Sequence, residues 1–252
     1  MQIVRFRADA KTRYGALEGG SVVEYTGTPW SLFRRGRRRY SLRQVVLLAP
    51  VVPGKIVGVG LNHHGHARDH GRSVPDEPPL FFKPISALIG PDDPIVAPPR
   101  CAHLECEAAL GVVMKRRCRN VTAARAREYV LGYAALNDVT ARDVQARDGD
   151  WTRAKAYDTF CPLGPCIATD LDPNTATIET WVNGALRRAG STKELVFGME
   201  DVIAHVSEIL TLLPGDVVAT GTPGASGRVE PGDRVEIRVE GVGGLRNAIV
   251  RL

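Results

Sequence analysis

Residues 233–240 limit the choice of fold most strongly, because charged and apolar residues alternate along them without interruption. One side of an extended chain would carry only branched apolar side chains, those of Val235, Ile237 and Val239. Side chains of a β-strand point to opposite faces in turn, so this pattern predicts a strand with one buried face. Upstream, residues 177–183 and 185–188 flank Asn183-Gly184, a dipeptide suited to a type I′ turn with positive φ at both positions. This part of the chain is therefore predicted to form a hairpin and a further strand.

Short apolar runs bounded by turn residues predict most other elements as strands. They occupy residues 20–25, 44–48, 55–61, 80–82, 94–97 and 104–113. A short helix is predicted at 122–129, with Thr122 as its N-cap, and a longer one at 199–212. The longer helix is expected to bury one face, made of Val202, Ile203, Val206, Ile209 and Leu210. Because strands and helices do not alternate as in a parallel sheet, we predict a mixed α/β fold, mostly β and closed or sandwiched, with peripheral helices.

The residue pattern changes after Pro53, and this change predicts two units of unequal size. Residues 1–53 form a small β-rich N-terminal unit closed by Pro50 and Pro53, and residues 54–252 form the larger unit. The smaller unit contains the run RRGRRR at 34–39, although the net charge of the whole chain is a mild +5. Aromatic residues do not interleave this run, so we interpret it as a solvated loop or an oligomer contact and expect no nucleic-acid partner.

The sequence also predicts the compartment and the state of the cysteines. No stretch reaches the apolar length of a membrane span, and charges interrupt the N-terminal residues where a secretory signal would be apolar. We therefore expect a cytoplasmic protein without a membrane partner.

The five cysteines, at 101, 106, 118, 161 and 166, form an odd set without a Cys-x-x-Cys pair. Buried free thiols are expected rather than disulfides or a thiolate zinc site.

Three carboxylates indicate a site for a hard metal ion. Glu105 and Glu107 lie two residues apart on a predicted strand, so they share a face and Cys106 points the other way. The strand continues into apolar sequence, where two unpartnered carboxylates would repel each other at high cost. Asp138 is a third acid at the end of another apolar run. An oxygen-only set of this kind suits Mg²⁺ or Mn²⁺; the alternative is a solvated polar edge.

Histidines crowd into residues 62–70, where four of them lie among polar neighbours. A zinc site and a solvated loop are both consistent with His63, His64 and His70. His66 differs because Asp69 follows three residues later, where one helical turn would allow the carboxylate to orient the imidazole as a general base. His66 and Asp69 are therefore candidate catalytic residues.

Two lysines and one turn are candidates for holding an anion. Lys155 lies in the aromatic and apolar context of residues 151–160, and Lys83 follows two phenylalanines. Each is either a surface ammonium on an apolar stem or a group that binds a substrate carboxylate or an oxyanion. Thr222, in the sequence GTPG at 221–224, lies either in a plain turn or in a cradle for a carboxylate.

At these residues the sequence resembles the fumarylacetoacetate hydrolase family, in its acylpyruvase and 2-hydroxyhepta-2,4-diene-1,7-dioate isomerase-like branch. The matching segments follow the family order over residues 55–252: KIVGVGLN (55–62), FFKP (81–84), SALIGP (86–91), ECEAALGVV (105–113), GYAALNDVTARDVQ (132–145), WTRAKAYDTFCPLGP (151–165), TLLPGDVVATGTPG (211–224) and VEGVGGLRNAIV (239–250). The resemblance implies a β-roll or β-sandwich catalytic domain in a homodimer, with residues 1–53 as the variable N-terminal region of the family.

The resemblance also implies roles for individual residues. Glu105 and Glu107 match the E-x-E metal ligands of the family, and Asp138 matches the third ligand. Positions that face the substrate match Arg142, Gln145 and Lys155, with Thr222 on a substrate-contacting turn. His66 matches the histidine of a lid, here at about residues 62–79. The lid pattern departs from the family at two positions, since His63 replaces a Tyr and Asp69 replaces a Glu.

These roles lead to a first hypothesis, which is hydrolysis of a carbon–carbon bond in an acylpyruvate-type 2-oxo acid. His66, oriented by Asp69, would activate water, and Lys155 with Gln145 and Lys83 would stabilise the negative charge that develops on the substrate. The alternative is isomerisation or decarboxylation of a hydroxymuconate-type diacid, or decarboxylation of oxaloacetate, as in aromatic catabolism. A non-catalytic nucleic-acid-binding protein and a zinc enzyme are ranked behind both.

Overall fold

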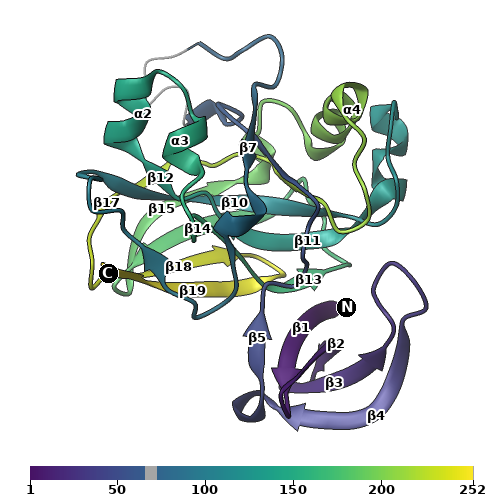
Figure 1. The fold of residues 1–252 in the computed structure, drawn as a ribbon. Helices are drawn as coiled ribbons and strands as arrows, with labels where there is room; N and C mark the ends of the chain where they lie inside the picture. The colour runs from purple at the N-terminus through teal and green to yellow at the C-terminus, as the bar shows by residue number, and fades with distance from the viewer. Residues whose placement is uncertain (66–72, 252) are drawn as a thin grey trace.

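The computed structural model describes residues 1–65 and 73–251, and it consists mostly of β-strands in two sheets (Figure 1). The larger sheet contains fourteen strands, and its main path runs β4-β3-β2-β1-β13-β11-β10-β16-β6-β7. The smaller sheet contains five strands in the order β15-β14-β18-β19-β9. The predicted fold class, mostly β with a few peripheral helices, is confirmed.

The first five strands form a lobe at one end of the molecule (Figure 1). They are β1 (Gln2–Ala8), β2 (Lys11–Glu18), β3 (Ser21–Thr26), β4 (Arg34–Ser41) and β5 (Val46–Leu48). The lobe shares the large sheet with the rest of the chain, because β1 pairs with β13 at Gln2–Ala168 and Ile3–Ile167. The run at 34–39 is therefore not a loop: it lies on β4, which ends the sheet, with its arginine side chains exposed.

The remaining strands of the large sheet build the centre of the molecule. They are β6 (Ile56–Val59), β7 (Leu80–Lys83), β8 (Leu88–Ile89), β10 (Leu104–Met114), β11 (Val130–Asn137), β12 (Thr140–Ala141), β13 (Cys161–Ala168), β16 (Val217–Ala219) and β17 (Ala225–Val229). The longest, β10, pairs with β11 on one side and with β16 and β17 on the other. It therefore forms the axis around which the other elements are arranged.

The smaller sheet packs against this centre through β14, β18 and β19, which contact β10, β11 and β13. Its strands are β9 (Ile95–Val96), β14 (Thr177–Val182), β15 (Ala185–Ser191), β18 (Arg234–Val239) and β19 (Gly243–Val250). The predicted hairpin is confirmed, since β14 pairs with β15 and both turn residues have positive φ, 52° at Asn183 and 80° at Gly184. The predicted alternation is confirmed as well, because Val235, Ile237 and Val239 are buried.

The helices are short and lie at the periphery (Figure 1). The α-helices that lie wholly within the described residues are α2 (Arg142–Asp148), α3 (Thr152–Lys155) and α4 (Met199–Ile209). The 3₁₀ helices there are η1 (Leu42–Gln44), η2 (Ile85–Ala87), η3 (Ala123–Tyr129) and η4 (Thr192–Glu194). Among the described residues, no helix has the length and apolar character needed to cross a membrane.

Both predicted helices are found, and one detail of the longer one was wrong. The segment after Thr122 is a 3₁₀ helix with Thr122 at its N-cap position, although the Thr122 side chain makes no capping hydrogen bond. Helix α4 buries Val202, Ile203 and Val206 as predicted, but the side chain of Ile209 is 56% exposed. The reason is that Ile209 is the last helical residue and the backbone becomes extended at Leu210, which turns that half-buried side chain inward instead.

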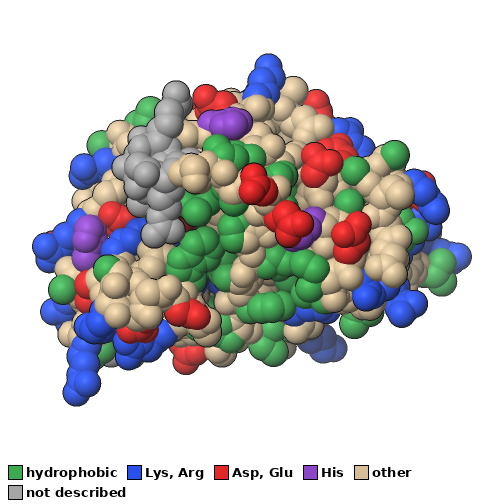
Figure 2. All heavy atoms as spheres, turned by 90° about the horizontal axis from the view of Figure 1, so that it is seen from above, with side chains coloured by type: hydrophobic (Ala, Val, Ile, Leu, Met, Phe, Trp, Pro, Cys, Tyr) green, Lys and Arg blue, Asp and Glu red, His purple; other side chains and the backbone are tan. Residues whose placement is uncertain are grey.

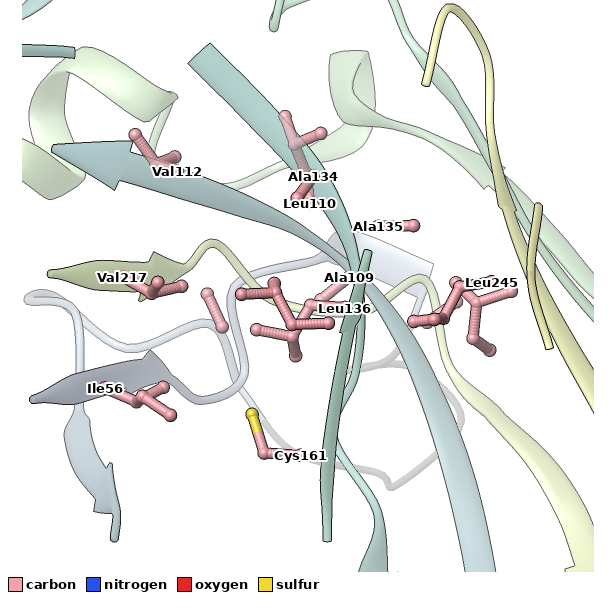
Figure 3. Close-up of a cluster of buried hydrophobic side chains, with 14 of the residues drawn as sticks. Ile56, Ala109, Leu110, Val112, Ala134, Ala135, Leu136, Cys161, Val217 and Leu245 are labelled. Carbon is pink, nitrogen blue, oxygen red and sulfur yellow. The ribbon is translucent and has the colours of Figure 1, made fainter. Parts of the chain in front are cut away.

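The core lies between the two sheets and between strands of the large sheet. Figure 3 shows a cluster to which several strands contribute, namely β6, β10, β11, β13, β16 and β19, through Ile56, Leu110, Leu136, Cys161, Val217 and Leu245 among others. All of these side chains are fully buried. Because so many strands share this cluster, the ends of β10 and β11 are held rigidly where they reach the polar residues described below.

Charge is distributed unevenly between the lobe and the rest of the chain. Residues 1–53 hold 10 of the 33 Lys and Arg residues but only 3 of the 28 Asp and Glu residues, a net charge of +7, so the remainder carries −2. On the face seen from above, Lys and Arg side chains lie around the periphery, and hydrophobic side chains gather in the middle (Figure 2). The basic character of the protein is thus concentrated in the N-terminal lobe.

All five cysteines are buried free thiols, as predicted. Burial raises the pKa of Cys101 to about 11 and the pKa of Cys106, Cys161 and Cys166 to about 12. At pH 8 a thiol with a pKa of 12 is ionised in about one molecule in ten thousand, and only the thiolate reacts. We therefore expect the folded protein to resist iodoacetamide at pH 8, and the unfolded protein to take up five alkyl groups, as measured by intact mass. Rapid labelling of the folded chain would contradict this burial.

Candidate active site

A cavity of about 490 Å³ opens beside the ends of β10 and β11. Its polar lining consists mainly of Glu105, Glu107, Asp138, Arg142, Gln145 and Lys155. Its apolar lining includes Val59, Leu61, Phe81, Ala109, Trp151 and Ala219. The structure therefore brings seven of the ten sequence-predicted site residues, these six and Thr222, to the lining of one cavity that apolar side chains also line. We call the six polar residues the polar wall.

The three carboxylates reach the cavity through local strand geometry and one pairing between strands. Glu105 and Glu107 share a face of β10, whereas Cys106 between them is fully buried outside the lining. Strand β11 runs antiparallel to β10 and ends at Asn137, so Asp138 arrives beside Glu107. The Asp138 N–H donates to the Glu107 carbonyl at 2.8 Å, which fixes this neighbourhood. The predicted common face of the two glutamates is thus found.

Arg142, the first residue of α2, neutralises two of the carboxylates. Its Nε donates to Glu105 Oε2 at 2.6 Å, and its Nη2 donates to Glu107 Oε1. Its Nη1 donates to Gln145 Oε1 at 2.9 Å, three residues along the helix. Burial opposes the charged form, but Glu107 and Glu105 raise the pKa of Arg142 above its usual value. The guanidinium is therefore a permanent positive charge at the polar wall.

Lys155, the last residue of α3, pairs with Asp138 and shares Glu107 with Arg142. Its Nζ donates to Asp138 Oδ2 at 2.6 Å, to Glu107 Oε2 at 2.9 Å and to Thr140 Oγ1 at 2.9 Å. It also lies 4.8 Å from the centroid of the Phe81 ring. Burial disfavours the ammonium, but Asp138 and Glu107 outweigh it and raise the pKa of Lys155. Because an ammonium has three N–H donors, all of them are engaged by the protein.

Lys83 is buried, so it is not the surface ammonium that was one of the two alternatives for it. It is fully buried on β7, and its Nζ donates to Asp138 Oδ1 at 2.6 Å and to the Val139 carbonyl at 3.3 Å. Its side chain lies behind Asp138 rather than in the cavity lining. Lys83 therefore holds a carboxylate of the protein in this structure, and its role in binding a substrate stays a prediction.

The apolar wall depends on two glycines that sequence reasoning did not single out. A Cβ added to Gly58 would lie 2.1 Å from the Phe81 ring, and one added to Gly60 would lie 1.9 Å from the Trp151 ring. The two rings pack edge to face with centroids 5.6 Å apart. Next to Gly60, Leu61 has a φ of 50°, a strained value for a residue with a side chain. These residues give the cavity a rigid, flat apolar side.

His103 was also missed as a site residue. It lines the cavity and lies on the same side of the chain as Glu105, with Nε2 3.0 Å from Glu105 Oε1. The signal was present in the sequence, because His103 precedes Glu105 by two residues and side chains at this spacing share a face. His103 therefore adds a ring nitrogen at the partly exposed rim of the polar wall.

The remaining predicted residues are placed as follows. Thr222 lines the cavity, but its hydroxyl is engaged in its own turn, donating to the Gly224 carbonyl at 3.0 Å and accepting from the Gly224 N–H at 3.2 Å. His63 is buried away from the cavity lining, with Nε2 3.4 Å from Glu194 Oε2, and burial lowers its pKa. His66 and Asp69, with His70, lie outside the described residues, so the catalytic pair and the zinc alternative stay predictions.

The carboxylate set fits a hard divalent cation by its chemistry. Among residues 1–65 and 73–251, no three His, Cys, Asp or Glu side chains are gathered closely enough to form a ready metal site. However, Glu105 and Glu107 both reach one guanidinium, and Glu107 and Asp138 both reach one ammonium. Three oxygen donors converge on cationic groups at one cavity wall, and such donors suit Mg²⁺ or Mn²⁺. We infer that these three residues would hold the ion.

Comparison with known protein families identifies the chain. Residues 55–250 match the model of the fumarylacetoacetate (FAA) hydrolase C-terminal region. The chain belongs to the fumarylacetoacetate hydrolase family. Residues 1–50 match a second model, the Rv2993c-like N-terminal region. All the cavity residues described above lie within the part of the chain that matches the hydrolase family.

Similar proteins of this family include isomerases, a hydrolase and a tautomerase. The solved 5-carboxymethyl-2-hydroxymuconate delta-isomerase from Mycobacterium smegmatis is 41% identical, with a TM-score of 0.94 and full coverage of both chains. Maleylpyruvate hydrolase from Sphingobium sp. SYK-6, solved with manganese(II) and pyruvate, is 32% identical, with a TM-score of 0.84 over 100% of this chain and 99% of that one. Oxaloacetate tautomerase Fahd2a of Rattus norvegicus is 38% identical over 82% of this chain and 70% of its own length.

Proposed function

We propose that this protein is a divalent-metal-dependent enzyme that acts on a small 2-oxo acid through its enolate, and that the reaction is an isomerisation or keto–enol tautomerisation. The observation that carries the proposal is the polar wall, where three carboxylates and two cationic side chains line one cavity together with apolar side chains. A 2-oxo acid offers a matching pair of features, a carboxylate next to a carbonyl at one end and a carbon chain at the other.

Arg142 and Gln145 are the residues best placed to bind the substrate carboxylate. The structure describes partners for three of the five N–H groups of Arg142, and two remain for a ligand in the cavity. Gln145 uses its carbonyl oxygen to accept from Arg142, which turns its amide NH₂ into a donor for the same carboxylate. A guanidinium and an amide held side by side recognise a carboxylate with fixed orientation.

The carbonyl end of the substrate would lie near Glu105, Glu107 and Asp138. A divalent cation held by these residues supplies Lewis acidity, which stabilises negative charge on the carbonyl and carboxylate oxygens. When a base takes a proton from the carbon next to the carbonyl, a role for which His66 is the candidate from the sequence, the electron pair of the broken C–H bond forms the new C=C bond and negative charge develops on the carbonyl oxygen. Lys155 lowers the energy of this charge through its field, because its own donors are engaged by protein acceptors.

Hydrolysis of an acylpyruvate is the second candidate. It is favoured by the likeness to maleylpyruvate hydrolase and by the sequence pair His66 and Asp69. Isomerisation is placed first because the similar isomerase and tautomerase are more identical to this chain than the similar hydrolase, 41% and 38% against 32%. Both reactions pass through an enolate, so the polar wall supports the shared step.

The test is proton exchange at the carbon next to the carbonyl. We expect the enzyme with Mg²⁺ or Mn²⁺ to exchange the C3 protons of oxaloacetate for deuterium in D₂O, as followed by ¹H NMR, and to lose this activity with EDTA. Arg142→Lys should raise KM about tenfold or more, whereas Arg147→Lys on the exposed side of the same helix should not. Absence of exchange with every metal would contradict the proposal.

A second arm of the same experiment separates the two candidates. Acylpyruvates and a hydroxymuconate-type diacid are incubated in H₂¹⁸O, and the products are analysed by mass spectrometry. Cleavage products with ¹⁸O in a new carboxylate would establish hydrolysis. An isomer of unchanged mass, apart from exchangeable positions, would establish isomerisation.

A further inference from the structure

The segment that leads into β10 lies between two cavities. His103 and Glu105 line the cavity of the candidate active site, whereas Cys101, Ala102 and Leu104 line a second cavity of about 370 Å³. The pairing of β10 with β12 and β17 begins at Leu104, after the three preceding residues. A segment with a cavity beside it lacks the close contacts that hold a packed chain in place. Hydrogen bonds must therefore position these three residues.

Asp143, the second residue of α2, supplies these bonds. Its Oδ2 accepts from the N–H of Ala102 at 3.2 Å, and its Oδ1 accepts from the N–H of His103 at 3.3 Å. The Cys101 thiol also donates to Oδ1, at 3.5 Å. The backbone adds a bond in the opposite direction, because the N–H of Arg142 donates to the His103 carbonyl at 2.8 Å. One carboxylate thus joins the first turn of α2 to the start of β10.

This junction sets how two parts of the polar wall face each other. Arg142 and Gln145 extend from α2, whereas Glu105 extends from β10. Helix α2 has only seven residues, and Ala141 at its N-cap makes no side-chain capping bond. The bonds to the start of β10 therefore fix where the helix begins. They also fix how far the two residues proposed to bind the substrate carboxylate lie from the residues proposed to hold the metal ion.

We propose that Asp143 is a positioning residue of this active site, which sets the place of Arg142 and Gln145 relative to Glu105. This role depends on the proposed function, because the carboxylate to be aligned is that of the 2-oxo acid. Asp143 is not part of the cavity lining, so it acts through these neighbours. Alignment has a large effect, since a misplacement of about 1 Å can lower turnover about a hundredfold.

Steady-state kinetics and metal binding test this role together. We expect Asp143→Ala to raise KM for oxaloacetate about tenfold or more in the proton-exchange assay. Asp143→Asn keeps one acceptor oxygen and should raise KM less. The dissociation constant of Mg²⁺ without substrate should change less than about threefold, because Asp143 bonds to the segment before β10 rather than to a metal ligand. Asp201→Ala is the matched control, since Asp201 is an exposed acid in the first turn of α4.

Cys101 provides a measurement that does not depend on activity. Burial raises the pKa of its thiol to about 11, and the negative charge of Asp143 contributes to this rise. Asp143→Ala removes that charge and releases the segment, so iodoacetamide at pH 8 should alkylate Cys101 at least about tenfold faster than in the wild type. The other four cysteines should stay unlabelled, whereas a general loss of structure would expose all five.

The results distinguish a failure of this role from a failure of the proposed function. A wild type that exchanges no protons contradicts the proposed function, and Cys101 labelling still tests whether Asp143 holds the segment. An active wild type with unchanged KM in Asp143→Ala, or with Cys101 labelled at the wild-type rate, overturns the role of Asp143 alone. Parallel loss of turnover, metal affinity and thiol protection would show a merely structural role and overturn it as well. If Asp143→Ala does not fold, Asp143→Asn is judged by the same criteria.

Discussion

Replacing Glu107 with Gln is expected to lower both activity and stability by large amounts. The Glu107 side chain is buried between Arg142 and Lys155, and Thr140 donates to it at 3.4 Å. Without its charge, three buried or half-buried cations, Arg142, Lys155 and Lys83, remain with only Glu105 and Asp138 to neutralise them. Removing one partner of a buried ion pair costs about 3–5 kcal/mol of unfolding free energy. Loss of a preorganised charge at a site of this kind lowers turnover by about two to three orders of magnitude.

The measurements are urea unfolding, proton exchange of oxaloacetate and metal affinity by calorimetry. Glu208→Gln is the control, because Glu208 is an exposed carboxylate at the end of α4. The double variant Glu107→Gln with Lys155→Met removes a negative and a positive charge together, so we expect it to regain part of the lost stability and none of the activity. Unchanged stability and turnover in Glu107→Gln would mean that the polar wall is not the site.

Local periodicity explains which parts of the fold were predictable. A strand with one buried face leaves a period of two in the sequence, so residues 233–240 predicted β18 and the 105–107 spacing predicted a shared carboxylate face. The turn at Asn183 was predictable because few residue pairs accept positive φ twice. These features depend on neighbours in the chain, which the sequence displays directly.

Long-range partners explain what was not predictable. Helical periodicity continues past Ile209, but the packing of α4 ends there, and no local signal marks that point. Likewise, nothing near Lys83 in the sequence shows that Asp138, 55 residues away, holds its ammonium. The resemblance to a family predicted that Arg142 and Lys155 contact the substrate. It did not predict their ion pairs with Glu105, Glu107 and Asp138, which the structure shows.

Replacing Lys155 with Met is expected to lower activity and to raise the affinity for the metal ion, because Lys155 lies between two of the carboxylates. Methionine keeps an unbranched apolar side chain of similar length, but it removes the charge that lies between Glu107 and Asp138 and against the Phe81 ring. Glu107 keeps Arg142 and Asp138 keeps Lys83, but the two carboxylates lose the cation they share. Their mutual repulsion is then less compensated in a buried place, so stability should fall by about 3–5 kcal/mol in the absence of metal.

The same repulsion should favour a divalent ion. A polar wall with one positive charge fewer attracts Mg²⁺ or Mn²⁺ more strongly, and we expect the dissociation constant measured by calorimetry to fall on the order of tenfold. Turnover should fall by about two to three orders of magnitude, because the field that stabilises the enolate is lost. Lys193→Met, at an exposed position on η4, is the control.

In Lys155→Met the metal affinity is expected to rise while the turnover falls. These opposite changes distinguish an electrostatic role of Lys155 from a merely structural one. If Lys155 only held the fold together, its loss would weaken metal binding and turnover in parallel, and added metal would not restore stability. We expect saturating Mg²⁺ to raise the unfolding free energy of Lys155→Met more than that of the wild type, since the ion takes over the neutralisation of Glu107 and Asp138. Equal stabilisation of both proteins would show that the ion does not bind at these carboxylates.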